Sequence, residues 1–267
     1  MNGIICYYSG SGNTKLAVKY IKSKISSLDF ELCDVVRDEA PDFSQYDVVG
    51  FATFTDFGGA PQYIHSFFDT INPQNHGYAF LFNTYGFLSG KTQKSLAKLA
   101  RSKNFEVLCG HSLHTPESYP PMRSRNKNFD DSPNQKELDK FDEFIAQLDD
   151  MLAAIQAGNK PGIKPIKIGL TGALFPSFSR TRAKKDFGKQ QVDINLCKEC
   201  GTCKKLCPYR AIELAPNLVF DHGKCRGCWS CYNHCPEKAI YTKKFKGEWQ
   251  YPKPSQQLVS KLETKQI

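Results

Sequence analysis

Two runs of four cysteines, each followed by a proline, constrain this chain more than any other feature. Both runs have the spacing C-x2-C-x2-C-x3-C-P and are offset by 28 residues throughout, so they form an internal repeat. Thiolates at this spacing hold cubane iron–sulfur clusters, because a two-residue gap lets three thiolates converge from one tight loop. The repeat therefore predicts two [4Fe–4S] clusters, which move single electrons. Its members are Cys197, Cys200, Cys203 and Cys207, then Cys225, Cys228, Cys231 and Cys235.

Two other uses of cysteine explain the repeat less well. Zinc would need only two C-x2-C pairs per metal, which leaves the third step and the prolines unexplained. Disulfides are typical of secreted chains, and the N-terminal sequence MNGIICYYSG lacks the charged segment and cleavage site of a signal peptide. The remaining cysteines, Cys6, Cys33 and Cys109, lie singly in apolar segments, where we expect small buried side chains. A reducing cytoplasm is the expected compartment.

Over about residues 190–245 the chain resembles the bacterial two-cluster ferredoxins, with every ligand position filled. In that family the last cysteine of each run binds the cluster of the other run. The resemblance implies a small α+β domain whose halves are tied together by the clusters and which needs them to fold. The implied ligand sets are Cys197, Cys200, Cys203 and Cys235 for one cluster, and Cys225, Cys228, Cys231 and Cys207 for the other.

Residues 1–157 alternate strand and helix patterns, which predicts a parallel sheet covered by helices on both faces. The segment 46–54 is almost continuously apolar, as expected of a strand that is buried on both faces. The helices are predicted from apolar residues at helical spacing. Strands are expected at 3–8, 30–36, 46–54, 78–83 and 105–111, and helices at 13–27, 61–71, 90–103 and 134–157.

The loop that follows the first expected strand suits a phosphate group. Its glycines let the backbone curl, and its N–H groups and hydroxyls converge at a helix N-terminus. It lacks the Gly-Lys-Ser/Thr of a Walker A loop and does not match G-x-G-x-x-G. It resembles the phosphate loop of flavodoxins, which bind FMN; an ordinary glycine-rich turn is the alternative. The loop residues are Ser9, Gly10, Ser11, Gly12, Asn13 and Thr14.

Two further strand ends should meet the same ligand, because ligands of parallel sheets lie at the carboxyl ends of the strands. Both combine aromatics and glycines, which suit the stacking and close backbone approach that an isoalloxazine ring needs. The second resembles the flavin loop of short-chain flavodoxins, which implies stacking by Phe87 or Tyr85; Phe54 or Phe57 is a weaker candidate. Surface or core packing is the alternative for each aromatic. The expected contacts are Thr53, Phe54, Thr55, Asp56, Phe57 and Gly58, then Asn83, Thr84, Tyr85, Gly86 and Phe87.

Three segments lie outside these motifs. Residues 111–133 are long for a loop in a compact domain, so we expect a lid over the flavin or a docking surface for the ferredoxin unit, with a mobile surface loop as the alternative. Residues 158–189 form a basic connector whose apolar stretch, 169–178, is expected to pack against a domain. The tail, 246–267, is expected to wrap onto the ferredoxin unit or to end loosely.

Charge is distributed unevenly along the chain. Residues 1–157 carry a net charge of −4 and residues 158–267 a net charge of +13. No nucleic-acid motif accompanies the basic half, which favours docking to an acidic redox partner over nucleic-acid binding. The sequence contains no run of 18 apolar residues, so it predicts no membrane span.

The whole chain resembles the flavodoxin–ferredoxin fusions of anaerobic bacteria and archaea. The resemblance implies a five-stranded parallel doubly wound FMN domain over 1–157 and a 2[4Fe–4S] unit over 190–245. Its expected activity is to pass electrons between the clusters and FMN, coupling one- and two-electron steps in anaerobic metabolism. An FMN-dependent reductase of a small organic acceptor, fed by its own ferredoxin domain, is the alternative. No catalytic proton-transfer residue is assigned. The expected partners are redox proteins, with a homodimer left open.

Overall fold

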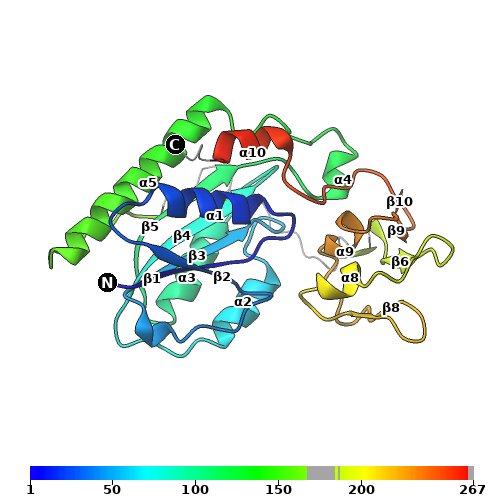
Figure 1. The fold of residues 1–267 in the computed structure, drawn as a ribbon, viewed down its shortest axis with the longest axis horizontal. Helices are drawn as coiled ribbons and strands as arrows, with labels where there is room; N and C mark the ends of the chain where they lie inside the picture. The colour runs from blue at the N-terminus through cyan, green and yellow to red at the C-terminus, as the bar shows by residue number, and fades with distance from the viewer. Residues whose placement is uncertain (167–183, 186, 264–267) are drawn as a thin grey trace.

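The computed structural model describes residues 1–166, 184–185 and 187–263 (Figure 1). The apolar stretch of the connector, 169–178, lies outside the described residues, so its predicted packing stays a prediction. The N-terminal domain and the cysteine-rich unit, residues 190–245, lie side by side (Figure 1).

A five-stranded parallel sheet forms the centre of the N-terminal domain. Its strand order, β2-β1-β3-β4-β5, is the flavodoxin-like order of doubly wound folds. All neighbouring strands are parallel. The predicted fold class is therefore confirmed. The strands are β1 (Gly3–Tyr7), β2 (Phe30–Asp34), β3 (Val48–Phe54), β4 (Tyr78–Tyr85) and β5 (Glu106–His114).

Helices cover both faces of this sheet, as expected of parallel strands that are buried on each side (Figure 1). Helices α1 and α5 pack on one face, and α2 and α3 pack on the other. Helix α5 begins with a capping box, in which the side chains of Asn134 and Glu137 each accept from the other's backbone N–H. The helices are α1 (Asn13–Lys24), α2 (Gln62–Asp69), α3 (Thr92–Arg101), α4 (Pro120–Arg123) and α5 (Gln135–Gln156), with a 3-10 turn, η1 (Phe43–Gln45).

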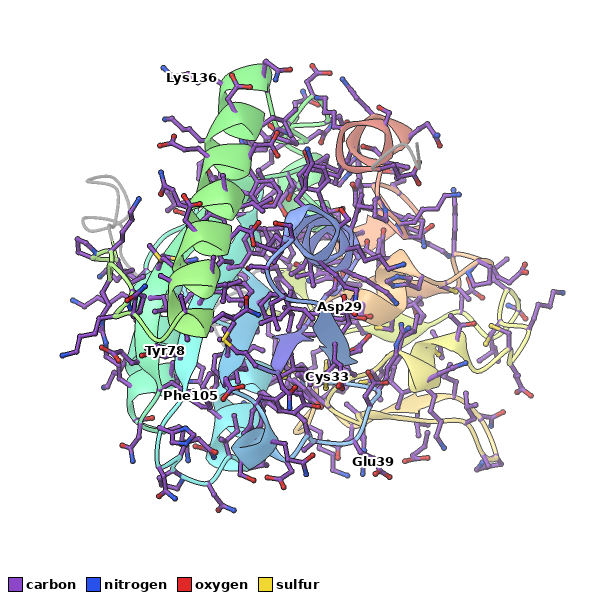
Figure 2. All side chains as sticks on the ribbon, turned by 60° about the vertical axis from the view of Figure 1, so that its left-hand side comes forward. Asp29, Cys33, Glu39, Tyr78, Phe105 and Lys136 are labelled. Carbon is purple, nitrogen blue, oxygen red and sulfur yellow. The ribbon has the colours of Figure 1, made fainter. Side chains whose placement is uncertain are left out.

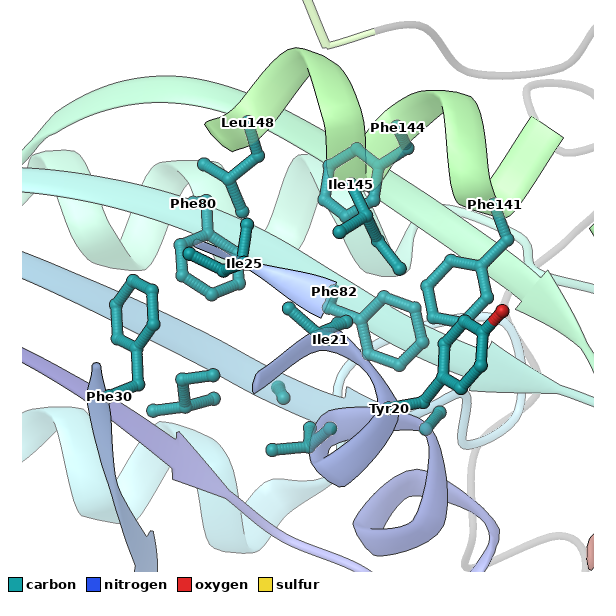
Figure 3. Packing of buried hydrophobic residues seen from close by; sticks show 14 of the residues in the cluster. Tyr20, Ile21, Ile25, Phe30, Phe80, Phe82, Phe141, Phe144, Ile145 and Leu148 are labelled. Carbon is teal, nitrogen blue, oxygen red and sulfur yellow. The ribbon is translucent and has the colours of Figure 1, made fainter. Parts of the chain in front are cut away.

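Aromatic side chains fill the core between the sheet and the α1–α5 face (Figure 3). Successive side chains of β4 point to opposite faces of the sheet. Phe80 and Phe82 therefore lie on the α1–α5 face, and Ala79 and Leu81 lie on the α2–α3 face. The ring of Phe82 lies 5.3 Å from that of Phe141 on α5. These contacts fix the orientation of β4, which carries one of the expected flavin loops at its end.

The three cysteines outside the repeat are buried, as predicted. Cys6 and Cys33 are not isolated in space, because they are register partners on β1 and β2. Burial raises the pKa of the Cys109 thiol to about 12, so it behaves as an apolar side chain. Figure 2 shows Cys33 among the interior side chains, while Glu39 and Lys136 lie at the outside.

The cysteine-rich unit is built from two short sheets and two short helices, which confirms the predicted small α+β domain. Its helices occupy equivalent positions in the two repeats, 28 residues apart, so the sequence repeat is also a structural one. Two antiparallel ladders, β10-β9-β6 and β7-β8, close the unit. The elements are β6 (Gln191–Val192), α8 (Thr202–Lys205), β7 (Ile212–Glu213), β8 (Val219–Phe220), α9 (Ser230–Asn233), β9 (Ile240–Thr242) and β10 (Phe245–Lys246).

The described part of the C-terminal tail contacts both units. Glu248 and Gln250 bond to Tyr232 of the cysteine-rich unit, as the predicted wrapping expects, and the chain then continues onto the first domain. It forms α10 (Gln256–Leu262), which packs beside α1 of the first domain (Figure 1). The side chain of Ser255 caps the helix by accepting from the N–H of Leu258. Leu258 and Leu262 lie one turn apart and are buried in the core of the first domain. Burial of these two leucines stabilises α10 on the first domain relative to a loose chain end, which was one of the two expectations.

The segment 111–133 is also more ordered than a long loop. Strand β5 continues to His114, and α4 forms soon afterwards, because Pro120 and Pro121 suit the first turn of a helix. None of the helices in the described parts of the chain has the length and apolar character needed to cross a bilayer.

Candidate functional site

A cavity lies at the carboxyl ends of the strands, between the first domain and the cysteine-rich unit. Loops after β1, β3, β4 and β5 form most of its wall, as expected for a doubly wound sheet. The remaining wall comes from Cys228, Ser230 and Asn233, at the start and end of α9. One cavity is thus shared by the predicted flavin loops and a cysteine of the repeat.

The structure brings together about half of the predicted flavin residues at this cavity. Its lining includes Gly10, Ser11, Asn13, Thr14, Phe54, Thr55, Thr84, Tyr85 and Gly86. Other predicted residues lie nearby in the same loops but do not line it: Ser9, Gly12, Thr53, Asp56, Phe57, Gly58, Asn83 and Phe87.

The predicted phosphate loop opens onto the cavity at the start of α1. Gly12 precedes the helix with φ of 97°, a left-handed conformation that favours glycine. Gly12 has no side chain that could cap the helix; the hydroxyl of Ser9 accepts from the N–H of Lys15 at 3.2 Å, and the first turn holds no acidic residue. The first-turn N–H groups and the positive end of the helix dipole thus suit a phosphate, as does the hydroxyl of Thr14, which is hydrogen-bonded to Thr84.

Among the four aromatics predicted to contact the flavin, two line the cavity. The ring of Tyr85 stacks on His114 at 5.0 Å, and Phe54 packs against Tyr8 at 4.9 Å, so both rings are held from behind. Phe87 instead lies 47% exposed and packs against Phe129. The ring of Phe57 packs edge-on against Tyr119. The structure therefore favours Tyr85 and Phe54 as ring contacts.

Residues 115–118 form one wall of the cavity, and none of them was predicted individually from the sequence to line it. Glu117 holds this wall to the β4 loop, since its carboxylate accepts from the N–H groups of Phe87, Ser118 and Tyr119. Burial raises the pKa of Glu117, while these hydrogen bonds and Arg123 act in the opposite direction. The unusual length of the 111–133 segment was the only sequence signal for this wall.

We expect Gly86→Ala to weaken flavin binding. A Cβ at this position would lie 2.5 Å from Oε2 of Glu117 and 2.8 Å from its Cα, so the β4 loop and the 115–118 wall would have to separate. Overpacking of this kind costs about 1–3 kcal/mol. Urea unfolding of the apoprotein and titration with FMN measure both effects. Gly59→Ala is the control, because a Cβ there meets only Asp56 O at 4.0 Å. Equal FMN affinities in the two variants would contradict the role of the contact.

The tail reaches the phosphate loop through Tyr251. Its hydroxyl donates to Oδ1 of Asn13 at 3.0 Å and accepts from the N–H of Ser255 at 3.0 Å. The amide of Asn13 in turn donates to the carbonyl of Pro116 at 3.0 Å. A side chain on Gly12 would meet Pro254 at 2.7 Å. The tail, the loop and the 115–118 wall therefore form one hydrogen-bonded group, which sequence motifs did not reveal.

Tyr251→Phe should destabilise the chain by about 1–3 kcal/mol, because it leaves Asn13 and Ser255 without a buried partner. Thermal unfolding measures this loss. Tyr46→Phe is a matched control, since the Tyr46 hydroxyl donates to Glu31 at an exposed position. A change there should stay within about 0.5 kcal/mol. If the two variants lose equal stability, the hydrogen bond between Tyr251 and Asn13 contributes nothing to the stability of the chain.

The eight cysteines of the repeat fall into two groups in space. Cys197, Cys200, Cys203 and Cys235 line a second cavity. Cys231 lies near the thiols of Cys228, Cys225 and Cys207, and also near that of Cys203 of the first group. Each group combines three cysteines of one run with the last cysteine of the other, which is the arrangement that the ferredoxin resemblance implies.

The electrostatics of the thiols suit a cluster. Burial and the neighbouring thiols raise the pKa of Cys203 to about 11 and raise that of Cys231 strongly. Converging buried thiolates are unfavourable alone, and bound iron would supply the compensating positive charge. Among the described residues, no three Cys, His, Asp or Glu side chains are placed to hold a single metal ion.

The histidines of the 111–133 segment have structural partners instead. The ring of His111 packs against those of Phe141 and Phe144, and burial lowers its pKa to about 4. His114 bonds to Glu137 and Ser132.

The fold and the cysteine repeat together define a flavodoxin-like domain joined to a two-cluster 4Fe–4S unit. The family model of the 4Fe-4S binding domain matches residues 191–213 and 218–241. The chain belongs to the same family as a protein of Methanocaldococcus jannaschii described as "Uncharacterized protein MJ0298". The two are 31% identical over 155 residues, which is 55% of this chain and 98% of the relative. These features support an electron-transfer or redox role.

Solved structures similar to the chain include two flavodoxins. An archaeal flavodoxin is 19% identical, with a TM-score of 0.43, over 57% of this chain and 99% of its own. The flavodoxin of Megasphaera elsdenii, in its two-electron reduced form, is 18% identical with a TM-score of 0.37, over 54% of this chain and 98% of its own. A flavoprotein of Lactobacillus acidophilus in complex with FMN is 19% identical with a TM-score of 0.35, over 42% and 92%.

Proposed function

We propose that this chain is a cytoplasmic electron-transfer protein that couples one-electron steps at two [4Fe–4S] clusters to two-electron chemistry at FMN. The observation that carries the proposal is the shared cavity, whose lining joins the phosphate-type loop after β1 to Cys228 of the cysteine repeat. Electron exchange requires donor and acceptor to be close, and fusion in one chain keeps them so. FMN accepts or gives one or two electrons, whereas a cubane cluster exchanges one.

The loop residues would hold the FMN phosphate without a cationic side chain. Ser11 and Thr14 line the cavity beside the start of α1, which supplies N–H donors. Tyr85 and Phe54 would flank the ring, while Thr55 and Gly86 allow polar contact and close backbone approach. The 115–118 wall and α9 would exclude water from the opposite side.

The eight cysteines would bind the clusters in the two groups described above. Cys203 and Cys231 belong to the buried core of the unit, together with Trp229 and Tyr232. The clusters would tie the two repeats together, because each group draws on both. We propose that residues 1–157 and α10 form the flavin domain, with 190–245 as the cluster unit.

The reductase alternative requires a small acceptor to reach the flavin. Ser230 and Asn233 of the cluster unit line the cavity, and Asn233 is anchored to Ser118 O at 2.9 Å. This wall favours exchange with the clusters over exchange with a free substrate. A homodimer remains outside the proposal.

Titration of the apoprotein with FMN and with riboflavin tests the flavin site. A phosphate-binding loop predicts much tighter binding of FMN, by at least about 100-fold, since riboflavin lacks the phosphate. Fluorescence quenching reports both affinities. Equal affinities would show that the loop does not bind phosphate, and no binding of either would remove the flavin from the proposal.

A further inference from the structure

The two cysteine repeats differ in how much of their surface is covered. Shifting the second run by 28 residues places Cys228 on Cys200, so every residue around one cysteine has a counterpart around the other. In the second run, residues 229–233 are all buried. In the first run, four of the seven residues in 199–205 are exposed, Cys200 among them.

The first domain covers the second run. The amide of Asn233 donates to Ser118 O at 2.9 Å, and the ring of Trp229 packs edge-on against Tyr119 at 5.8 Å. Cys228 immediately precedes Trp229 in the sequence and lines the flavin cavity. This face of the unit is therefore an internal electron-exchange surface, if the proposed function holds.

The equivalent face of the first run has no covering domain in the described structure. Lys205 replaces the buried Asn233, and Lys204 replaces the buried Tyr232. Ile194 is 71% exposed and Leu196 is 42% exposed, beside Cys197. Two exposed apolar side chains next to a cluster site would suit the apolar centre of a protein interface.

Charge indicates the kind of partner. The strip 194–205 holds Lys198, Lys204 and Lys205 against one acid, Glu199, within a half of the chain that carries +13. Lys204 is paired with Glu213, which leaves Lys198 and Lys205 against Glu199 and a positive balance on the strip. Electrostatic complementarity of a basic rim around an apolar centre favours an acidic protein and speeds its association.

We infer that the exposed strip 194–205 is the docking surface for a small acidic one-electron carrier protein; this inference rests on the proposed function. Electrons would then pass from the partner to the cluster of the first run, next to the cluster of the second run, and finally to the flavin cavity. Each encounter delivers one electron and oxidises the carrier by one electron. Two encounters supply the two electrons that the flavin site stores, with protons taken from solvent. The reverse flow runs through the same order.

Ile194→Glu tests the surface, with Ile163→Glu as its matched control. Both isoleucines are exposed, at 71% and 49%, and both substitutions add one negative charge. The probe is a purified acidic two-cluster ferredoxin, and the measurement is its affinity by calorimetry for the cluster-loaded chain at low salt. We expect Ile194→Glu to weaken binding at least tenfold and Ile163→Glu to change it less than twofold. Raising the salt concentration should weaken binding to the unmodified chain.

Three results would overturn the inference: no binding of the ferredoxin to the unmodified chain at low salt, equal affinities in the two variants, or self-association of the chain that Ile194→Glu abolishes. The last would make a second copy the occupant of the strip. Iron, sulfide and FMN content and reduction of the flavin by dithionite are measured on the same samples. If the unmodified chain lacks iron, sulfide and FMN, the proposed function is rejected. If it contains them but Ile194→Glu binds the ferredoxin as tightly as Ile163→Glu does, only the docking surface is rejected.

Discussion

Replacing Cys231 with serine is expected to lower the iron content of the anaerobically purified chain from about eight to about four atoms. The reason is its position: the Cys231 side chain is only 8% exposed and lies in the core of the cysteine-rich unit. Its thiol lies near those of Cys207, Cys225 and Cys228, its proposed partners, and near that of Cys203, which belongs to the other group. A serine hydroxyl is a poor ligand for a cubane iron, and the buried site would keep neither the cluster nor its own packing.

The control for this experiment is Cys109→Ser. Cys109 is also buried, at 5% exposure, but lies on β5 of the first domain. Its replacement should leave about eight iron atoms per folded chain. Iron and sulfide assays, with absorption spectra, compare the two variants. Equal iron in both would contradict the assignment of Cys231 as a ligand.

The second large effect is expected at Ser11, where an aspartate should abolish FMN binding without unfolding the chain. Ser11 lines the cavity at the start of α1. A carboxylate about 4–5 Å from a phosphate repels it by roughly 3–4 kcal/mol at an effective dielectric constant near 20, which weakens binding by more than 100-fold. The same carboxylate interacts favourably with the helix dipole, so the fold should lose little stability.

Ser11→Asn is the matched control, since it has a similar size and no charge. Its FMN affinity should stay within about tenfold of the unmodified protein, and the difference between the two variants reports the charge alone. Riboflavin binding should respond weakly to Ser11→Asp, because the repelled phosphate is missing. If Ser11→Asp binds FMN as well as Ser11→Asn does, the phosphate does not lie at this loop.

The doubly wound sheet could be predicted from the sequence because its signals are local. Segment 46–54 is almost continuously apolar, and β3 (Val48–Phe54) is buried along nearly its whole length. The cysteine repeat is also a local pattern, and its crossed grouping follows from the family that it resembles. The ends of the strands were predicted less accurately. Strands β4 and β5 continue to Tyr85 and His114, where polar residues gave no sign of a strand.

The rest of the site depends on contacts between distant segments. Tyr251 bonds to Asn13 across 238 positions, and nothing near Tyr251 in the sequence marks Asn13 as its partner. The packing of α10 on the first domain was not predicted for the same reason, although Ser255, Leu258 and Leu262 do carry a helix cap and an apolar pair. Phe87 matched a family position, yet packing on Phe129 holds it away from the cavity.

Joining the two domains has a physical consequence beyond proximity. Four segments meet at the start of α1: the phosphate loop, the 115–118 wall, α9 and the tail. Asn13, Ser118 and Asn233 take part in the hydrogen bonds that connect them. The proposed flavin site is therefore completed by the cluster unit and the tail, so changes in either should alter the flavin even where they do not touch it.

Reductive titration of the anaerobically purified protein tests the central claim most directly, because the claim is that one chain holds a flavin and two clusters in electronic contact. We expect about eight iron, eight sulfide and one FMN per chain, and uptake of about four electrons, two at the flavin and one at each cluster. Reduction of the flavin should follow electrons delivered at the clusters. Full clusters with no FMN after reconstitution, or a bound flavin that stays oxidised while the clusters are reduced, would contradict it.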